Sequence, residues 1–405
     1  MPSFTEARGL ILDRVAPLGI ERVGILEAAG RILAENLEAP WEMPLCDNSA
    51  MDGFAVRAAD CTTIPVSLKV AGYIPAGGEV SGPVEPGCAI RIMTGAPIPP
   101  GCDAVVPVEE TEGDGDAVRI VAPVKERQHI RFKGEDVAAG ETVIPAGTLI
   151  HPPEISMLAS FGKALVPVFR RARVAILSTG DELIELGSPP VPGKIINSNT
   201  LSLAAAVRQC GAEPIILGIA RDDRESHREK LAEGLRADAL ITSAGVSAGD
   251  RDLVRDVLAE LGVEQLFWKV DMKPGGPTAF GMYGEKPVFS LPGNPVSTMV
   301  TFEIFARPAL LRMMGHRNVV RPFVKATLRE DAKKKAGKVN FLRVQVTQRN
   351  GRLEASTAGD QHTGILRTMV RSNGLVLLPL EASVVPAGTE VDLMILRDDA
   401  TMLEN

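Results

Sequence analysis

The feature that most constrains the fold is an alternation of apolar runs and helix-patterned segments between residues 173 and 261. Three short apolar runs are expected to be buried strands: residues 174–178, 214–219 and 239–242. The segments that follow them carry apolar residues at helical spacing: residues 201–210, 224–235 and 253–261. Strands separated by helices predict βαβ units and a parallel sheet, and the ligands of such sheets bind at the carboxyl ends of the strands. We expect Asn199 or Ser198 to cap the first helix.

A turn rich in glycine and serine, residues 242–252, joins the third expected strand to the third expected helix. Gly245 and Gly249 would let a ligand approach the backbone closely, and the hydroxyls of Ser243 and Ser247 can bond phosphate-like oxygens. The helix that follows offers unpaired N–H groups. The turn therefore indicates a binding site for an anion.

Acidic and basic side chains follow the same strands. They are Glu182, Asp222, Asp223, Asp250 and Asp252, together with Lys269 and Lys273. Carboxylates beside an anion repel it unless a cation lies between them, so this set favours a phosphorylated ligand held through Mg²⁺, with lysine as a direct phosphate partner. Alternatively, these carboxylates are solvated surface groups, with Asp250 capping the helix and Asp252 in its first turn, where carboxylates are favoured anyway.

Composition excludes several classes of protein. The chain has 405 residues, which predicts two to four domains. Its 44 basic and 51 acidic residues give a net charge of −7, and the one compact basic run, residues 333–335, is expected to be a solvated loop, so nucleic acid is not an expected partner. Five cysteines without a CxxC pair, and no apolar run long enough to cross a membrane, indicate a cytoplasmic protein without disulfides or structural zinc.

The flanking regions have other patterns. Residues 5–37 predict an amphipathic helix, and residues 53–140 predict short strands between Pro/Gly turns. Near the C-terminus, Asn350-Gly351 lies between two strand-like runs and predicts a hairpin with a type I′ turn. The sequence has no Walker motif, no complete GxGxxG, no HExxH and no GxSxG, which excludes the commonest nucleotide-binding and hydrolase classes. Asp52 and Asp136 lie in glycine-containing loops, where a turn-forming role is the simpler interpretation.

Eight phrases nevertheless occur together in a characteristic order. They are SAMDGFA (49–55), RIMTGA (91–96), GCDAVV (101–106), RFKGED (131–136), STGDEL (178–183), TSAGVSAGDRD (242–252), WK with KPG (268–275) and LPGNPVS (291–297). With these phrases over nearly its whole length, the chain resembles the molybdopterin molybdenumtransferase family, the MoeA type that includes the E domain of gephyrin.

The resemblance implies a function. It is the insertion of molybdate into adenylylated molybdopterin with release of AMP, assisted by Mg²⁺, in a homodimer whose site is shared between the α/β domain of one subunit and the β-rich insertion of the other. An alternative of another class is a molybdopterin-binding protein that kept the fold and lost turnover. A third interpretation, a pterin adenylyltransferase, is disfavoured because that activity resides on the α/β domain alone.

The resemblance also implies a fold of the class α/β plus β, with several domains. A central, doubly wound, parallel α/β domain would span residues 171–318, and a β-rich inserted domain residues 45–140. An elongated, mixed helical N-terminal domain would comprise residues 1–44 and 141–170, and a small barrel-like β domain residues 319–405.

Site residues follow from the matching phrases. The active-site polar groups would be Asp52, Thr94, Asp136, Glu182, Asp222 and Asp252, with Glu182 and Asp252 as the metal-side carboxylates. The groups that bind substrate would be Ser243, Gly245, Ser247, Gly249, Lys269, Lys273, Pro292, Pro295 and Arg343.

The chain departs from the family pattern at a few positions. Gly276 replaces the second lysine of a Lys-Pro-Gly-Lys-Pro phrase, which removes one cation. Ala244 replaces the first glycine of a double glycine, and its methyl group limits how closely a ligand can approach. Residues 361–364 match a serine-bearing phrase only loosely, so no role is assigned there.

Overall fold

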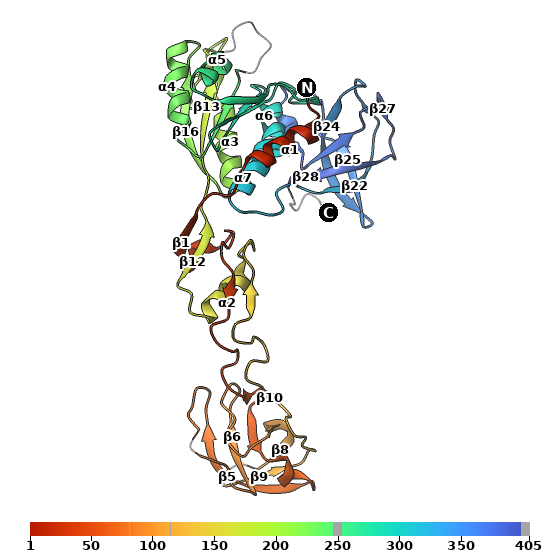
Figure 1. Cartoon of the computed structure of the whole chain (residues 1–405). Helices are drawn as coiled ribbons and strands as arrows, with labels where there is room; N and C mark the ends of the chain where they lie inside the picture. Colours follow the sequence, from red (N-terminus) through yellow and green to blue (C-terminus); the bar gives the residue numbers. More distant parts are fainter. Residues whose placement is uncertain (81, 114, 246–252, 398–405) are drawn as a thin grey trace. The chain divides into compact units, whose positions relative to one another are not determined.

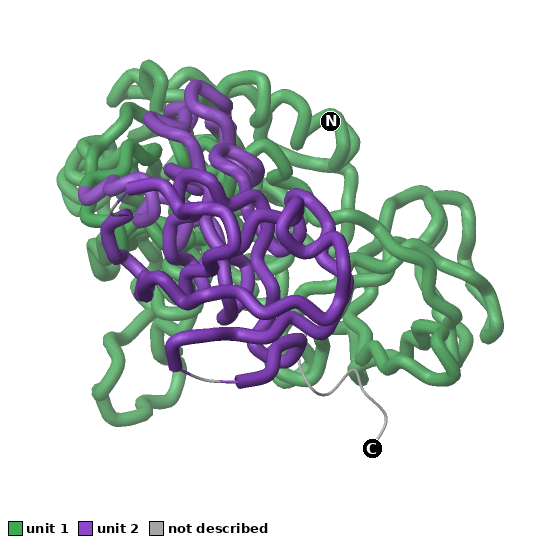
Figure 2. Tube along the Cα trace, turned by 90° about the horizontal axis from the view of Figure 1, so that it is seen from below, with its two compact units in different colours: residues 1–34, 147–151, 165–405 green, residues 35–146, 152–164 purple. Residues whose placement is uncertain are grey.

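The computed structural model of the chain describes residues 1–80, 82–113, 115–245 and 253–397 (Figure 1). The backbone packs into two compact units, which Figure 2 shows in different colours. Unit 1 comprises Met1–Ala34, Gly147–His151 and Leu165–Asn405, and unit 2 comprises Glu35–Ala146 and Pro152–Ala164. The four domain boundaries given above stay a prediction. Within the described ranges, no helix has both the length and the apolar character needed to span a membrane.

A six-stranded sheet of described residues forms the centre of the α/β part of unit 1 (Figure 1). In spatial order its strands are β16 (Glu213–Ala220), β13 (Arg173–Thr179), β17 (Ala239–Ser243), β21 (Lys286–Leu291), β20 (Ala279–Tyr283) and β18 (Glu264–Phe267). The first four are parallel to one another, as predicted. β20 and β18 are antiparallel to their neighbours, because β20 and β21 form a hairpin that the sequence pattern did not predict.

Helices cover both faces of this sheet. One face carries α3 (Ser198–Gln209) and a continuous helix made of α6 (Pro295–Thr301), a π-helical turn η4 (Phe302–Ala306) and α7 (Arg307–Met313). The other face carries α4 (Arg224–Gly234) and α5 (Leu253–Glu260). Along β17, Ile241 packs into the first core and Leu240 into the second, because successive side chains of a strand point to opposite faces. The predicted doubly wound arrangement is confirmed.

The helix predicted over residues 5–37 is wrong beyond Arg14. α1 spans Phe4–Arg14 and begins with a capping box of Ser3 and Glu6. Pro17 and Gly19 then interrupt the helical pattern, because proline disfavours helix in the residue before it and glycine in a helix costs conformational entropy. The chain continues as β1 (Ile20–Gly24) and a short 3₁₀ helix, η1 (Ile25–Ala28).

β1 pairs antiparallel with β12 (Leu165–Phe169), so that Ile20 lies opposite Phe169. Further along, the Gly147 N–H donates to the Leu33 carbonyl at 2.7 Å, and the Leu33 N–H donates to the Thr148 carbonyl at 2.9 Å. Residues 33 and 147, which flank the long insertion of residues 35–146, are therefore neighbours within unit 1.

A small β-barrel forms the C-terminal part of unit 1 (Figure 1). Its sheet contains β19 (Met272–Lys273), β24 (Val339–Arg349), β25 (Arg352–Thr357), β22 (Phe323–Leu328), β28 (Glu390–Ile395) and β26 (Gly374–Leu378). The sheet closes because β26 also pairs with β24. The φ angles of Asn350 and Gly351 are +49° and +76°, which confirms the predicted turn. Outside the sheet lie α8 (Arg367–Arg371) and the pair β23 (Ala332–Lys333) and β27 (Val384–Val385).

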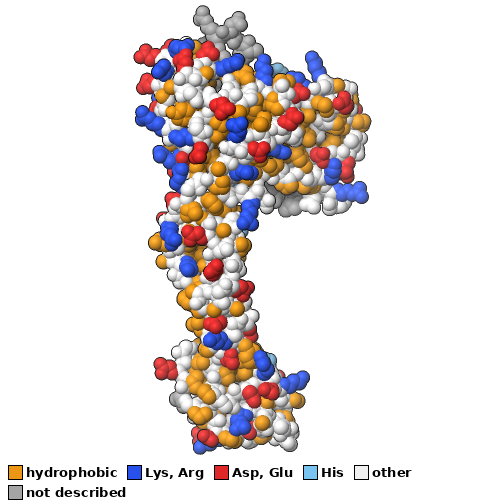
Figure 3. All heavy atoms as spheres, in the orientation of Figure 1, with side chains coloured by type: hydrophobic (Ala, Val, Ile, Leu, Met, Phe, Trp, Pro, Cys, Tyr) orange, Lys and Arg blue, Asp and Glu red, His pale blue; other side chains and the backbone are white. Residues whose placement is uncertain are grey.

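Unit 2 is β-rich, as predicted. Its main sheet contains β7 (Ala104–Pro107), β4 (Gly53–Val56), β6 (Cys88–Ile92), β5 (Val66–Ile74), β9 (Ala117–Ile120) and β8 (Thr111–Glu112). Shorter elements are β2 (Leu37–Glu38), β3 (Asn48–Ser49), η2 (Ala58–Cys61), η3 (Val108–Glu110), β10 (Ile130–Arg131), β11 (Thr142–Ile144) and α2 (Pro152–Ser160). On the face of the molecule seen in Figure 3, acidic and basic side chains are interspersed on the surface, without a large patch of one sign.

Candidate functional site

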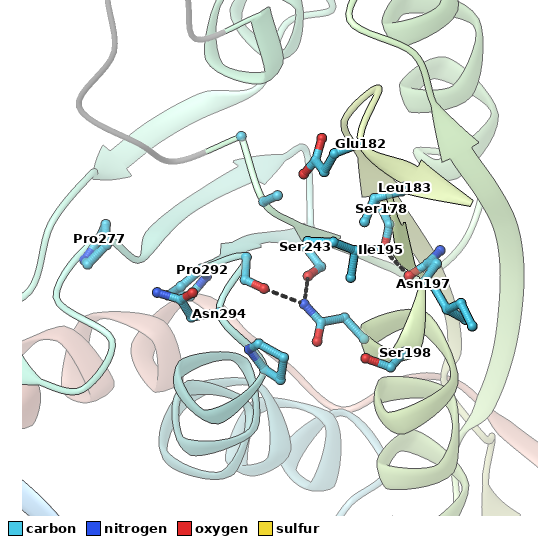
Figure 4. A pocket seen from close by; sticks show the side chains of 16 residues that line it. Ser178, Glu182, Leu183, Ile195, Asn197, Ser198, Ser243, Pro277, Pro292 and Asn294 are labelled. Carbon is cyan, nitrogen blue, oxygen red and sulfur yellow. Dashed lines mark hydrogen bonds between the residues drawn. The ribbon is translucent and has the colours of Figure 1, made fainter. Parts of the chain in front are cut away.

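A pocket of about 400 Å³ lies at the carboxyl ends of β13, β17 and β21 (Figure 4). Its walls come from the loops after these strands, from the ribbon of β14 (Leu183–Ile184) and β15 (Ile195–Ile196), and from the first turn of α3. The structure brings five predicted site residues together here: Glu182, Ser243, Gly245, Pro292 and Pro295. They converge because the parallel strands end at one edge of the sheet. We call this the strand-end pocket.

Glu182 belongs to the loop that follows β13, and its carboxylate lies over Gly180. Gly180 has a φ of +135°, and a Cβ atom at this position would overlap the carboxylate. Among the described residues, none forms a hydrogen bond or an ion pair with the Glu182 carboxylate. The carboxylate is therefore available to a cation or a hydrogen-bond donor in the pocket.

The capping of α3 differs from the prediction, which named Asn199 or Ser198. Asn197 is the cap, because its Oδ1 accepts the N–H of Thr200 at 3.3 Å, three residues along the chain. Ser178, near the end of β13, donates its hydroxyl to the same Oδ1 at 3.0 Å (Figure 4). The Asn199 side chain instead bonds to the loops beside the pocket, because its Nδ2 donates to Ser243 Oγ at 2.8 Å and to the Gly293 carbonyl at 2.7 Å.

The backbone after β17 has two consecutive residues in the left-handed region. Ala244 has a φ of +77° and Gly245 a φ of +75°. Alanine in this region carries a steric penalty of about 1–2 kcal/mol that glycine avoids. The Ala244 N–H donates to the Leu291 carbonyl at 3.1 Å, which fixes the turn against the loop after β21.

We expect Ala244→Gly to stabilise the protein by about 0.5–1 kcal/mol, since relief of the left-handed strain exceeds the entropy that glycine adds to the unfolded chain. The free energy of unfolding in urea measures the change. The matched control is Ala259→Gly, in α5, where glycine should destabilise by about 1 kcal/mol. Destabilisation by both substitutions would contradict the assignment of strain to Ala244.

Asp222 follows β16 at the same edge of the sheet but does not line the strand-end pocket. Its carboxylate accepts the Asp181 N–H at 3.2 Å, and its own N–H donates to the Asp181 carboxylate at 3.3 Å. This reciprocal pair joins the loops after β13 and β16. Asp223 caps α4, because its Oδ1 accepts the Ser226 N–H at 2.8 Å.

A second pocket, of about 100 Å³, lies beside the barrel, and five of its twelve lining residues are basic. They are Lys273, Lys333, Lys334, Lys335 and Arg343. The expectation that Lys273 lies at the α/β sheet edge is wrong, because β19 pairs with β24 of the barrel and sets Lys273 opposite Asn340. The run 333–335, expected to be a solvated loop, also lines this pocket: Lys333 and Lys335 are exposed, and Lys334 Nζ donates to the carbonyls of Lys338 and Leu380. We call this the basic pocket.

Arg343 is only 1% exposed, and its guanidinium is bonded within the barrel domain. Nε donates to Thr368 Oγ1 at 2.8 Å, and Nη2 donates to the carbonyls of Asp360 and His362 at 3.2 and 3.3 Å. Burial lowers the pKa of the guanidinium. These bonds give Arg343 a role in holding residues 360–362 in place.

The two pockets are linked by one hydrogen bond and one chain segment. Asn294 lines the strand-end pocket, and its Nδ2 donates at 3.3 Å to Thr363 Oγ1, which lines the basic pocket. The segment 273–277 begins with Lys273 in the basic pocket and ends with Pro277 in the strand-end pocket. The two pockets are therefore neighbours within unit 1.

In unit 2, Asp52 and Thr94 form a pair. Gly53 lies opposite Ile92 in antiparallel strands, which brings the residue before Gly53 close to the turn after β6. Asp52 Oδ1 accepts the Thr94 N–H and the Thr94 hydroxyl, both at 2.7 Å. These two bonds hold the pKa of the Asp52 carboxyl below its ordinary value.

The lowered pKa predicts a pH dependence. The folded state favours the ionised form of Asp52 more than the unfolded state does. The contribution of Asp52 to the free energy of unfolding is therefore present above the ordinary Asp pKa of about 4, and it is lost as the pH falls through the lowered folded pKa. We expect Thr94→Val, which removes the hydroxyl but keeps the N–H, to raise the pKa of Asp52 toward its ordinary value. An NMR titration of the side-chain carboxyl carbons measures this. Equal midpoints in the two proteins would show that the hydroxyl bond has no effect on ionisation.

The remaining predicted residues are not brought to a pocket by the described structure. Asp136 and Lys269 are exposed, and neither side chain forms a hydrogen bond or ion pair among the described residues. Ser247, Gly249, Asp250 and Asp252 lie outside the described residues.

Comparison with known proteins places these features in a family. Residues 2–162 match the model described as MoeA N-terminal region (domain I and II), residues 175–312 a probable molybdopterin binding domain, and residues 325–396 the MoeA C-terminal region (domain IV). The chain belongs to the MoeA family.

Individual members of the MoeA family match over the full length. Molybdopterin molybdenumtransferase 2 of Mycobacterium tuberculosis is 40% identical over 97% of this chain and 99% of its own, and molybdopterin molybdenumtransferase of Haemophilus influenzae is 36% identical over 97% and 98%. The crystal structure of the molybdopterin biosynthesis MoeA protein from Pyrococcus horikoshii superposes with a TM-score of 0.85, with 30% identity over 98% of this chain and 99% of that one.

Two residues depart from the MoeA pattern, and the structure accommodates both. Ala244 adopts a glycine-like conformation, as described. Gly276 accepts the N–H groups of Val270 and Thr278 at its carbonyl, and a Cβ atom added to it would lie 3.2 Å from the Met272 carbonyl. A lysine at position 276 would therefore need a small shift of the backbone in this chain.

The donors at the strand-end pocket are of the type that Mg²⁺ prefers. Within the described ranges, no three His, Cys, Asp or Glu side chains form a metal-binding group. Glu182 supplies one unengaged carboxylate, a hard oxygen ligand. The second predicted carboxylate, Asp252, lies outside the described residues.

Sequence reasoning missed three residues that build the pockets: Asn199, Asn294 and Thr363. Asn294 belongs to the phrase LPGNPVS, in which only the prolines were assigned a role. Asn199 could have been found by placing the helix cap at Asn197, because its side chain is then left without a capping partner.

Proposed function

We propose that this MoeA-family chain is a molybdenum insertase, which transfers molybdate into adenylylated molybdopterin, releases AMP and forms the molybdenum cofactor. The observation that carries this proposal is that the segment matching a probable molybdopterin binding domain, residues 175–312, contains the strand-end pocket. The names of the relatives that match the chain over its full length support the same activity.

In this proposal the phosphate groups of the pterin nucleotide lie against Ser243 and Gly245. Ser243 supplies a hydroxyl at the end of a central strand, and the left-handed backbone at Gly245 allows a close approach. Pro292 and Pro295 form one wall of the pocket, and because proline has no backbone N–H, this wall does not donate hydrogen bonds to water there. Ser247 and Gly249 extend this phosphate contact in the sequence-based prediction.

Molybdate, a dianion, would bind in the basic pocket. Lys273, Lys333 and Lys335 line it with exposed ammonium groups, and it shares the segment 273–277 with the strand-end pocket. Lysine is a compact charge that binds oxyanions without a fixed geometry. The segment 273–277 and the hydrogen bond from Asn294 to Thr363 connect the two pockets, which supports transfer of the oxyanion from one to the other.

Mg²⁺ would be held by Glu182 and Asp252, and when bound it polarises a phosphoryl oxygen. The carboxylate of Glu182 supports this assignment, because it faces the pocket without a partner among the described side chains. The protein's own contribution is to hold the substrate: Ser243 donates to an anionic oxygen, and the proline wall limits access of water.

The proposal includes a homodimer in the cytoplasm. Several large apolar side chains of unit 1 are exposed near the strand-end pocket, and Leu186 and Ile195 are 69% and 60% exposed. Ile195 also lines the pocket, so a second copy of the chain that covered it would lie beside the site. Sedimentation equilibrium at micromolar concentration tests the oligomeric state.

The activity is tested by incubating the purified chain with adenylylated molybdopterin, molybdate and Mg²⁺. We expect AMP release that depends on molybdate and on Mg²⁺, together with molybdenum bound to the pterin. Omitting molybdate and omitting Mg²⁺ are the controls. Tight binding of molybdopterin without any AMP release would support the non-catalytic binding protein instead.

A further inference from the structure

The side chain of Asn199 joins two walls of the strand-end pocket. Its Nδ2 donates to Ser243 Oγ, at the end of β17, at 2.8 Å, and to the carbonyl of Gly293, in the loop after β21, at 2.7 Å. An amide nitrogen carries two protons, so these two bonds use both of them. Its distance of 3.4 Å to Thr298 Oγ1 is at the limit of a hydrogen bond.

The Gly293 carbonyl fixes the orientation of this amide. A carbonyl oxygen only accepts hydrogen bonds, so the group that faces it must be the Asn199 nitrogen, and a flipped amide would place two oxygens in contact. Since the same nitrogen faces Ser243, the Ser243 oxygen accepts from Asn199. The proton of the Ser243 hydroxyl is then left to donate elsewhere, and Ser243 lines the pocket.

The amide oxygen of Asn199, unlike its nitrogen, forms no hydrogen bond among the described residues. Asn199 Oδ1 is buried and finds no donor among the described residues. A buried acceptor without a partner reduces stability. The chain thus keeps an unfavourable group at a position where its two N–H groups hold the pocket.

We propose that Asn199 is a positioning residue that orients the Ser243 hydroxyl as a donor to an anionic phosphate oxygen of the bound nucleotide. The bond from Asn199 prevents Ser243 from pointing its proton at Asn199, and the bond to Gly293 holds the loop after β21 beside Ser243. This inference rests on the proposed function, because it takes the ligand of the strand-end pocket to be the pterin nucleotide.

A double-mutant cycle with AMP and Mg²⁺ as the probe tests the proposal. Isothermal titration calorimetry gives the dissociation constant of AMP for the full-length wild type, Ser243→Ala, Asn199→Leu and the double variant. We expect Ser243→Ala to weaken binding about tenfold in the wild-type background, as for loss of a charge-assisted hydrogen bond. In the Asn199→Leu background the same change should cost about twofold or less, because the hydroxyl there is no longer oriented.

The matched control is Ser202→Ala, which removes a hydroxyl from α3 that donates to the Asn199 carbonyl at 3.0 Å and does not line the pocket. It should change AMP binding by less than about twofold. If Asn199→Leu does not fold, Asn199→Asp replaces it; the added charge is present with and without Ser243 and cancels in the cycle.

The outcomes separate the two proposals. If the wild type binds AMP and Ser243→Ala costs the same in both backgrounds, or nothing in the wild type, the role of Asn199 is overturned and the pocket assignment stands. A merely structural Asn199 would lower the thermal unfolding temperature and leave the cost of Ser243→Ala unchanged. If the wild type does not bind AMP, the inference fails, and the AMP-release assay decides separately whether the proposed function fails with it.

Discussion

Glu182→Gln should lower the rate of AMP release from adenylylated molybdopterin by about 100-fold, with little change in stability. The substitution keeps the shape of the side chain but removes the charge that faces the strand-end pocket. Because that carboxylate has no partner among the described residues, its charge is not needed to hold the fold. Single-turnover AMP release over a range of Mg²⁺ concentrations measures the effect, and the concentration for half-maximal rate should rise.

The control for this variant is Glu185→Gln, which makes the same change of charge three residues along the chain, at an exposed position outside the pocket. Its rate should stay within about twofold of the wild type. Equal loss of activity in both variants would show that the general negative potential of this loop matters, and would refute a specific metal-side role for Glu182.

A second large effect is expected for Arg343→Met, this time on stability. The methionine can fill much of the space, but the buried Thr368 hydroxyl loses its Nε donor, and the carbonyls of the exposed residues Asp360 and His362 lose their Nη2 donor. Leaving a buried polar group unpaired costs about 1–3 kcal/mol, and losing a hydrogen bond at a more exposed group costs about 1 kcal/mol, so we expect the barrel to be destabilised by about 2–4 kcal/mol. Hydrogen exchange of the β24 and β26 amides, which report on local opening, measures the loss.

Arg349→Met serves as the comparison, because Arg349 lies on the same strand but is exposed, with Glu354 at 3.9 Å. It should cost less than about 1 kcal/mol. If Arg343→Met instead leaves hydrogen exchange unchanged and raises the KM for molybdate, Arg343 acts mainly on the substrate and its internal bonds are secondary.

The α/β region was predicted well from sequence because two simple periodicities operate there. The strand predicted over residues 239–242 is β17 (Ala239–Ser243), and the helix predicted over residues 224–235 is α4 (Arg224–Gly234). The helix prediction failed where apolar residues at helical spacing lie in a strand and a 3₁₀ helix. After Pro17 they lie in β1 and η1, and β1 is a strand because it pairs with β12, a partner that local pattern does not reveal.

The site residues that follow the parallel strands could be predicted from sequence, whereas those set by distant pairing or by cap geometry could not. Glu182, Ser243 and Pro292 lie at one pocket because consecutive parallel strands must end at one edge of the sheet, which is a rule of topology. Lys273 was misplaced because its neighbours are set by a pairing with β24, far along the chain. Asn199 was misassigned because the cap lies two residues earlier, a difference that only the geometry of the Asn197 side chain decides.

The pairing of β1 with β12 also fixes the order in which the chain can fold during synthesis. α1 and β1 leave the ribosome first, but their partners come much later: Ile20 pairs with Phe169, and Phe4 packs edge-to-face on Phe341 at 5.2 Å. The inserted residues 35–146 contain a complete sheet with its own core, so they can fold before the partners of α1 and β1 have been synthesised. A nascent chain halted near residue 200, so that all of unit 2 has left the ribosome, should then have unit 2 protected from protease and α1 open to cleavage.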